Sequence, residues 1–149
     1  MNRTLILVEE IIAAGLLVAV CYPLFRYGSL EGVAVPWHFS GGEIDSWGNR
    51  TIFIWLAAIA AAIYGLLWVT QKYPKLVNIP GVDTAANPLA AQAMASALKM
   101  WSMALFAWLS IRLYLIALGK ASQPLFGVLL LILLATLLHV GYLTYAARR

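Results

Sequence analysis

Four stretches of the chain are apolar, and polar segments separate them. They cover roughly residues 4–25, 51–70, 91–118 and 124–147. A helix needs about 20 apolar residues to cross the ~30 Å hydrocarbon core of a bilayer, and each stretch reaches that length. The pattern therefore predicts four transmembrane helices that pack as a bundle.

Three connections join these stretches. Residues 26–50 are polar, glycine-rich and aromatic, and we expect them to form an ordered loop. Residues 71–88 contain three prolines, which disfavour a helix in the interior of this segment. Residues 119–123 leave room only for a tight turn, so the third and fourth helices should be antiparallel neighbours.

Composition also indicates a membrane protein. The 149 residues are 63% hydrophobic and only 11% charged, whereas an average soluble domain is about 45–50% apolar and about 25% charged. A soluble fold of this length could not bury so much apolar surface. We therefore expect an all-α integral membrane protein, in which residues 1–149 form one membrane domain with lipid as its surroundings.

The polar residues exclude several function classes. The ten basic residues are scattered near helix ends and form no run that could follow a phosphate backbone, so nucleic-acid binding is not expected. Cys21 is the single cysteine, which excludes an internal disulfide. The sequence has no phosphate loop, zinc-protease motif or serine-hydrolase motif, and we expect no catalytic residue and no cofactor.

The distribution of Lys and Arg predicts the orientation in the membrane, because cytoplasmic helix ends carry an excess of positive charge. One side has five basic residues near helix ends: Arg3, Lys72, Lys75, Arg148 and Arg149. The other side has three: Arg26, Arg50 and Lys120. This majority predicts that both termini are cytoplasmic and that loop 26–50 faces outward.

Loop 26–50 carries a first group of candidate residues. Gly41-Gly42 predicts a turn that would fold His38 back towards Glu43 and Asp45. An imidazole and two carboxylates could form a metal or proton site. The alternative is a structural loop in which His38 is hydrogen-bonded locally and three aromatic residues pack on the helix ends: Trp37, Phe39 and Trp47.

The same loop resembles a family of bacterial membrane domains found as the N-terminal part of SdpI-type immunity proteins. The family pattern is approximately Pro-x-His-aromatic-Asn, a short spacer, then Gly-x-x-Asp-x-aromatic-Gly-x-Lys. The matching residues here are Pro36, His38, Phe39, Gly42, Asp45, Trp47, Gly48 and Arg50. The resemblance continues through Tyr73-Pro74 and Asn78-Ile79-Pro80 and covers roughly residues 10–118. Ser40 and Arg50 depart from the Asn and Lys of the family, which weakens any transfer of a specific ligand.

The resemblance implies a multi-pass protein of the bacterial cytoplasmic membrane. SdpI-type proteins protect a cell against a secreted peptide toxin and can relay its presence to a regulator. The leading hypothesis is therefore a non-enzymatic module that binds or senses a ligand at its outer face, with a peptide toxin or another membrane protein as partner. The residues expected to bind are His38, Glu43, Asp45, Trp47 and Arg50, with Trp47 as an interfacial anchor and Arg50 as a tether to lipid headgroups.

A second group of candidates is expected inside the membrane: Glu9, Glu10, Lys99, Arg112 and His139. A charge there costs several kcal/mol unless it is paired or hydrated, so each is a functional candidate. At about 1.5 Å per residue, Glu10, Lys99 and His139 reach similar depths on the cytoplasmic side. They could relay protons or bind a cation, or Glu10 and Lys99 could simply fix helix packing while Glu9 stays at the interface. Lys99 could also extend its charge to the headgroups.

Further hypotheses follow from these two groups. Arg112 lies in the outer half, where Asp45 or Glu43 could pair with it and hold the loop over the bundle. An ion- or proton-coupled transport component would use Glu9, Glu10, Lys99 and His139, and four helices enclose so little volume that it would need a homo-oligomer. A metal-dependent membrane enzyme would be centred on His38, with Glu43 and Asp45 as further ligands.

Overall fold

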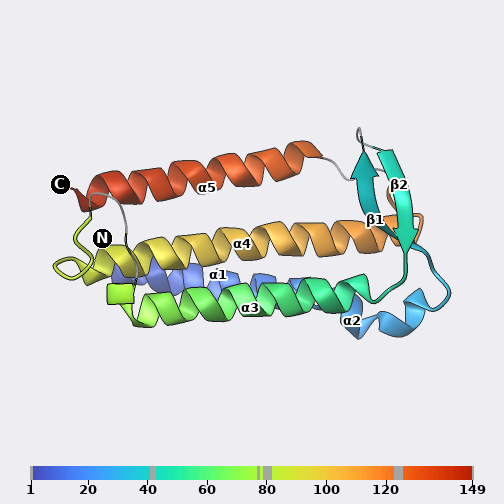
Figure 1. The fold of residues 1–149 in the computed structure, drawn as a ribbon, viewed down its shortest axis with the longest axis horizontal. Helices are drawn as coiled ribbons and strands as arrows, with labels where there is room; N and C mark the ends of the chain where they lie inside the picture. The colour runs from blue at the N-terminus through green and yellow to red at the C-terminus, as the bar shows by residue number, and fades with distance from the viewer. Residues whose placement is uncertain (1, 41–42, 77, 79–81, 123–125, 149) are drawn as a thin grey trace.

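The computed structural model of the chain describes all residues except 1, 41–42, 77, 79–81, 123–125 and 149 (Figure 1). In chain order its elements are α1 (Arg3–Val20), α2 (Tyr22–Phe25), the 3-10 turn η1 (Tyr27–Leu30), β1 (Val35–Ser40), β2 (Glu43–Gly48), α3 (Ile52–Lys72), the 3-10 turn η2 (Pro74–Leu76), α4 (Pro88–Ala117) and α5 (Phe126–Ala147).

Asparagine side chains mark the start of two long helices. The side-chain oxygen of Asn2 accepts a hydrogen bond from the backbone N–H of Thr4 over 2.9 Å. That of Asn87 accepts one from Ala90 over 3.2 Å, and Pro88 occupies the first position of α4. Each cap satisfies a backbone donor that the helix leaves unpaired. The third predicted helix therefore begins at Pro88, three residues before the expected position.

The first predicted helix is interrupted near its end. We expected it to run over residues 4–25, but α1 ends at Val20 and α2 begins at Tyr22 after a single turn residue. Pro23 explains the break, because a proline lacks the backbone N–H and clashes with the carbonyl one turn earlier.

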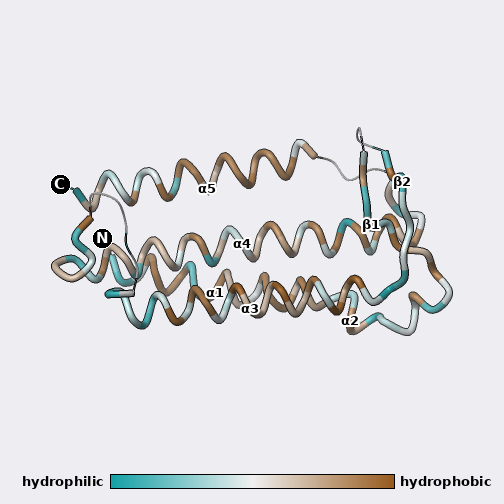
Figure 2. Tube along the Cα trace, in the orientation of Figure 1, coloured by the Kyte–Doolittle hydropathy of each residue, from teal (hydrophilic) through white to brown (hydrophobic). Residues whose placement is uncertain are grey.

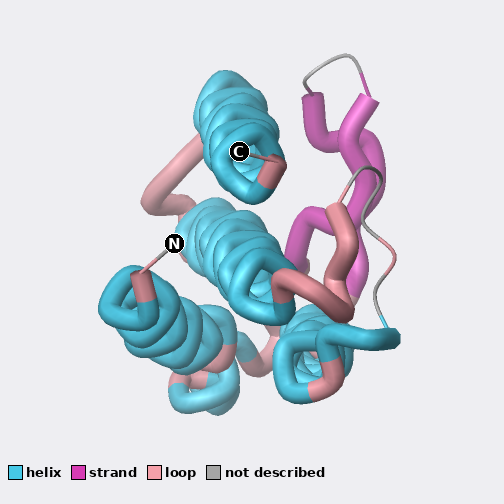
Figure 3. Tube along the Cα trace, turned by 90° about the vertical axis from the view of Figure 1, so that its left-hand side faces the viewer, coloured by secondary structure: helices cyan, strands magenta, loops and turns pink. Residues whose placement is uncertain are grey.

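Helix α4 is the centre of the bundle. Helices α1 and α3 pack along it on one side, and α5 packs on it from another side (Figure 3). The central core cluster joins α1, α3 and α4 through Ala13, Val20, Ala57, Ala60, Met103 and Ala107. Although α3 is rich in alanine, its only buried alanines are Ala57 and Ala60, whereas α4 buries most of the small residues of the described core. Close helix approach therefore depends on α4 at least as much as on α3.

Three helices of the described residues are long and apolar enough to cross a membrane: α3, α4 and α5. Figure 2 shows that α5 is apolar over most of its length, and leucines such as Leu130, Leu134 and Leu138 are exposed on it. Exposed apolar faces of this extent indicate contact with lipid. The prediction of a mostly helical chain with helices apolar and long enough to span a membrane is confirmed, but four such helices are not shown, because α1 also carries Arg3, Glu9 and Glu10.

The expectation of an all-α protein needs correction. Loop 26–50 contains an antiparallel hairpin in which β1 pairs with β2, from Val35 opposite Gly48 to Ser40 opposite Glu43. The predicted Gly41-Gly42 turn lies outside the described residues. The hairpin stands at the end of the bundle opposite to both termini (Figure 1), and Val35 joins a second core cluster there with Leu30, Phe53, Leu113 and Tyr114.

The C-terminus of α4 is closed by a glycine motif. Gly119 has a φ of 70°, in the left-handed region that glycine adopts without strain. Its backbone N–H donates to the carbonyl of Ile116, and the N–H of Lys120 donates to that of Leu115. These two bonds form a Schellman motif, which reverses the chain so that α5 can return antiparallel along α4.

Candidate functional site

The hairpin holds one candidate group. The Nδ1 atom of His38, on β1, lies 2.7 Å from Oδ1 of Asp45, on β2. Both side chains are exposed, so the pair links the two strands but contributes less than about 1 kcal/mol to stability. The pairing of β1 with β2 therefore brings His38 to Asp45.

The other loop residues have different surroundings. The guanidinium of Arg50 donates to the backbone carbonyl of Tyr27 over 3.0 Å and lies 4.3 Å from the centre of the Tyr27 ring. Arg50 therefore fastens the end of the hairpin to η1, in addition to any contact with lipid headgroups. Glu43 is exposed at the start of β2.

Three tryptophans surround the base of the hairpin. Trp37, Trp47 and Trp55 are each more than half exposed. Trp37 and Trp55 also line an open pocket of about 400 Å³ together with residues of the β2–α3 connection. Exposed tryptophans at one end of a membrane bundle are typical of the membrane–water interface, where one side of the ring contacts lipid and the N–H contacts water.

Neither metal binding nor the Arg112 pairing gains support from the hairpin. Within the described ranges, no group of three His, Cys, Asp or Glu residues could hold a metal ion. Asp45 contacts His38, and a contact of either loop acid with Arg112 stays a prediction.

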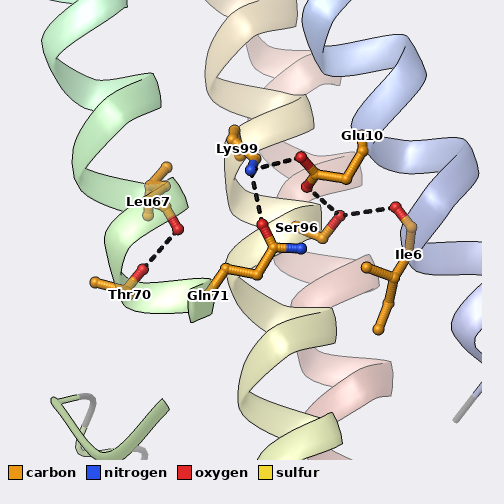
Figure 4. A network of polar contacts seen from close by, with 7 residues as sticks. All are labelled: Ile6, Glu10, Leu67, Thr70, Gln71, Ser96 and Lys99. Atoms are coloured by element: carbon orange, nitrogen blue, oxygen red, sulfur yellow. Dashed lines mark hydrogen bonds and ion pairs between the residues drawn. The ribbon is translucent and has the colours of Figure 1, made fainter. Parts of the chain in front are cut away.

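A second group lies inside the bundle near the end that carries the termini. The ammonium of Lys99, on α4, lies 2.7 Å from Oε2 of Glu10 on α1 and donates to Oε1 of Gln71 on α3 over 2.8 Å (Figure 4). The hydroxyl of Ser96 lies 3.0 Å from Oε1 of Glu10. It also reaches the carbonyl of Ile6 over 3.3 Å.

Lys99 does not extend to the headgroups. Its side chain is 0% exposed, and its ammonium lies 4.9 Å from the centre of the Tyr64 ring, an arrangement that favours a cation. A buried charge is costly unless it is paired and hydrogen-bonded, and the contacts of the Lys99 ammonium with Glu10, Gln71 and Tyr64 offset that cost.

The remaining acid joins a different helix. Oε1 of Glu9 lies 3.3 Å from Nε2 of His139, on α5. The indole N–H of Trp101, on α4, donates to Nδ1 of the same imidazole over 3.1 Å. Glu9 is 2% exposed rather than interfacial. The two neighbouring acids of α1 therefore lie on opposite sides of α4, Glu10 towards α3 and Glu9 towards α5.

Sequence reasoning missed the neutral partners of these charges. Gln71 was assigned to the second connection, although α3 continues to Lys72. Ser96 carried no signal of its own in an alanine-rich segment. Trp101 lies within the third apolar stretch and gives no sign of a polar role. Only the spacing of Ser96 and Lys99, three residues apart on one helical face, could have suggested a shared polar surface.

Comparison with known proteins adds no relative: no family model, no curated protein and no solved structure matches the chain. The resemblance to SdpI-type proteins therefore stays a prediction that rests on the sequence pattern.

Proposed function

We propose that the protein is a non-enzymatic membrane module that binds a ligand at its hairpin end. The observation that carries this proposal is the exposed hairpin, which combines the His38–Asp45 pair with tryptophans at its base. Aromatic rings and a polar pair side by side suit an amphipathic ligand, since the rings offer apolar area and the pair offers hydrogen bonds. A membrane-active peptide is the specific ligand that the SdpI-like loop pattern suggests.

In this proposal four helices cross the membrane. Helix α1 has 18 residues and the short α2 has 4. At about 1.5 Å per residue, the two helices together are long enough to span about 30 Å. The acids of α1 do not prevent it from spanning, because Glu10 is paired with Lys99 and Glu9 faces His139. Charges inside a bundle are tolerated when they face its interior and find partners.

The proposed location is the bacterial cytoplasmic membrane, with both termini in the cytoplasm. The two termini lie at the same end of the bundle (Figure 1). The larger set of basic residues belongs to that end, including Arg3, Lys72 and Arg148. The hairpin then faces outward, where a secreted peptide would meet it.

A protection assay tests the proposal. Wild type and variants would be expressed at matched membrane levels in a sensitive bacterium, which is then challenged with a panel of membrane-active peptides. His38→Ala and Asp45→Ala should each lower the tolerated peptide concentration about tenfold, equivalent to about 1.4 kcal/mol of binding. Folding should be preserved, because the pair is exposed.

Glu31→Ala is the matched control, since Glu31 is an exposed acid near the same end of the bundle. It should protect as well as wild type. Absence of protection against every peptide, or equal protection by the hairpin variants and wild type, would contradict a ligand site on the hairpin.

A second candidate function is favoured by the buried network of Glu9, Glu10, Lys99 and His139. Such groups inside a bundle are typical of ion or proton pathways. A transport component of this kind would show pH-dependent flux in liposomes and would need a homo-oligomer to enclose a path. Flux that is lost in Glu9→Gln, together with no protection against any peptide, would favour it over the ligand-binding function.

A further inference from the structure

Trp101 determines where His139 can carry its proton. An indole N–H can only donate a hydrogen bond, so Nδ1 of His139 must accept it and must be free of a proton. A neutral imidazole then has its single proton on Nε2, the atom that faces Glu9. A positively charged imidazole would carry protons on both nitrogens and would lose the bond from Trp101. Trp101 therefore favours a neutral His139.

A neutral His139 leaves the network with more acids than cations. Glu10 and Lys99 form one ion pair, and their charges cancel. Glu9 has no such partner, since the group that it faces in ion-pair range is the imidazole of His139, 3.3 Å away. An ionised Glu9 would therefore leave one uncompensated negative charge, at a position that is 2% exposed. Burying an unpaired carboxylate costs far more than burying the neutral acid.

The hydrogen bonding of Glu9 also favours the neutral acid over the carboxylate. Neither of its carboxyl oxygens has a hydrogen-bond partner within the described part of the chain. The Nε2 contact lies within ion-pair range but not in hydrogen-bond geometry. A buried carboxylate would normally gather several donors around its charge, as Glu10 does with Lys99 and Ser96.

We propose that Glu9 is a proton-binding site inside the bundle, and that Trp101 directs the proton to Glu9 by keeping His139 neutral. The carboxylate of Glu9 takes up one proton, and the network of two acids and one lysine then becomes electrically neutral. Glu10 stays ionised beside Lys99. The Glu9–His139 pair thus takes up the one proton that neutralises the network.

The groups around Glu9 come from three helices. Glu10 on α1 repels a second negative charge, while Ser96 on α4 and His139 on α5 offer a hydroxyl and an imidazole. Helix α3 contributes Tyr64 and Gln71, which face Lys99 instead. Lys99 is committed to Glu10 and Gln71, so no other cation of the described residues is placed to neutralise Glu9.

His139 provides the route to this site. Its side chain is 23% exposed, whereas that of Glu9 is 3% exposed. A proton from water can bind to Nδ1 of the imidazole, which breaks the Trp101 bond, and Nε2 then passes its own proton to Glu9. Water moves the remaining proton from Nδ1 to Nε2, after which Nδ1 can again accept the bond from Trp101. This exchange needs no co-reactant besides water.

Infrared spectroscopy of the protein in lipid bilayers at neutral pH tests the proposal. A protonated carboxylic acid has a C=O stretch that a carboxylate lacks. Wild type should show this band, and Glu9→Gln, which keeps the shape of the neutral acid, should lose it completely. Glu31→Gln should retain it. A wild type without the band, or a band that survives in Glu9→Gln, would overturn the proposal.

Trp101→Phe separates the role of the indole from that of the acid. Without the indole N–H, His139 can carry both protons, so the Glu9 band should shrink and nitrogen NMR of labelled histidine should show a charged imidazole. An unchanged band together with a neutral His139 would show that Trp101 does not determine where the proton binds. This inference rests on the transport function proposed above. The spectroscopic tests detect a protonated Glu9 even in a protein without flux, so the proton site and the transport function can be refuted independently.

Discussion

At the scale of single residues, Lys99 has the largest energetic consequences. It is a fully buried cation whose contacts join α1, α3 and α4 at one point. A hydrophobic residue of similar length would pack in the same space without the cost of burying a charge. Replacing Lys99 or Glu10 alone should therefore cost much more stability than replacing both.

Lys99→Met should lower the free energy of unfolding by about 3 kcal/mol, because Glu10 would remain inside the bundle without its cation. The double variant Lys99→Met with Glu10→Gln should recover most of that loss. Unfolding in mixed micelles of wild type, both single variants and the double variant gives the coupling energy. Additive losses would mean that Glu10 and Lys99 do not depend on each other.

The ionisable residues of this network could be placed from the sequence, but their neutral partners could not. Counting about 1.5 Å per residue from the helix ends predicts one depth for Glu10, Lys99 and His139. The structure pairs Glu10 with Lys99, and it places His139 beside Glu9 rather than beside these two. The depth of a residue in the membrane does not predict the direction in which its side chain points from the helix axis. The opposite directions of Glu9 and Glu10, and the part that Trp101 plays, depend on how the helices are rotated against one another.

At the scale of elements, α3 has a buried face and an exposed face, and two adjacent alanines lie one on each. Ala60 is fully buried in the central cluster with Ala57, whereas Ala61 is exposed. Both are alanines in the middle of the same helix, so they differ in surroundings and not in helix propensity. This pair allows the packing of α3 to be tested directly.

Ala60→Leu should destabilise the protein by about 1–3 kcal/mol, because the added carbons have no space between the helices. Ala61→Leu should change stability by less than about 0.5 kcal/mol, because its side chain is exposed. Thermal unfolding in detergent compares the two variants. Equal losses would mean that α3 is packed on both faces, as in a tight oligomer.

The helices could be predicted from apolar length, but the hairpin could not. A half-buried strand is recognised by alternation of buried and exposed residues. In β1 the register shifts between Pro36 and His38 and again between His38 and Phe39, and Trp37 and His38 are consecutive exposed residues. This irregularity removes the alternation, and Pro36 further weakens the strand signal. Only an ordered loop could be inferred.

At the scale of the whole molecule, the bundle has two different ends. One carries both termini, and the other carries the hairpin (Figure 1). Helices α3, α4 and α5 alternate in direction along the bundle, and α1 runs parallel to α4 (Figure 1). Any orientation in a membrane therefore places the two termini on one side and the hairpin on the other.

Labelling with a membrane-impermeant thiol reagent in intact cells tests this arrangement. In a Cys21→Ala background, Ser40→Cys on the exposed hairpin should be labelled in intact cells, and Ala146→Cys near the C-terminus only after the cells are opened. A tag at the N-terminus should behave like Ala146→Cys. Labelling of both positions in intact cells would contradict a membrane orientation in which the hairpin and the C-terminus lie on opposite sides.

The network that joins α1 to α4 and α5 also constrains how the protein is made. A ribosome synthesises α1 first, when neither Lys99 nor His139 exists, so Glu9 and Glu10 meet the insertion machinery without their partners. An acid at the centre of an inserting helix costs about 2.5–3.5 kcal/mol. Helix α1 is thus expected to wait at the membrane surface and to take its final place only when the second half of the chain emerges.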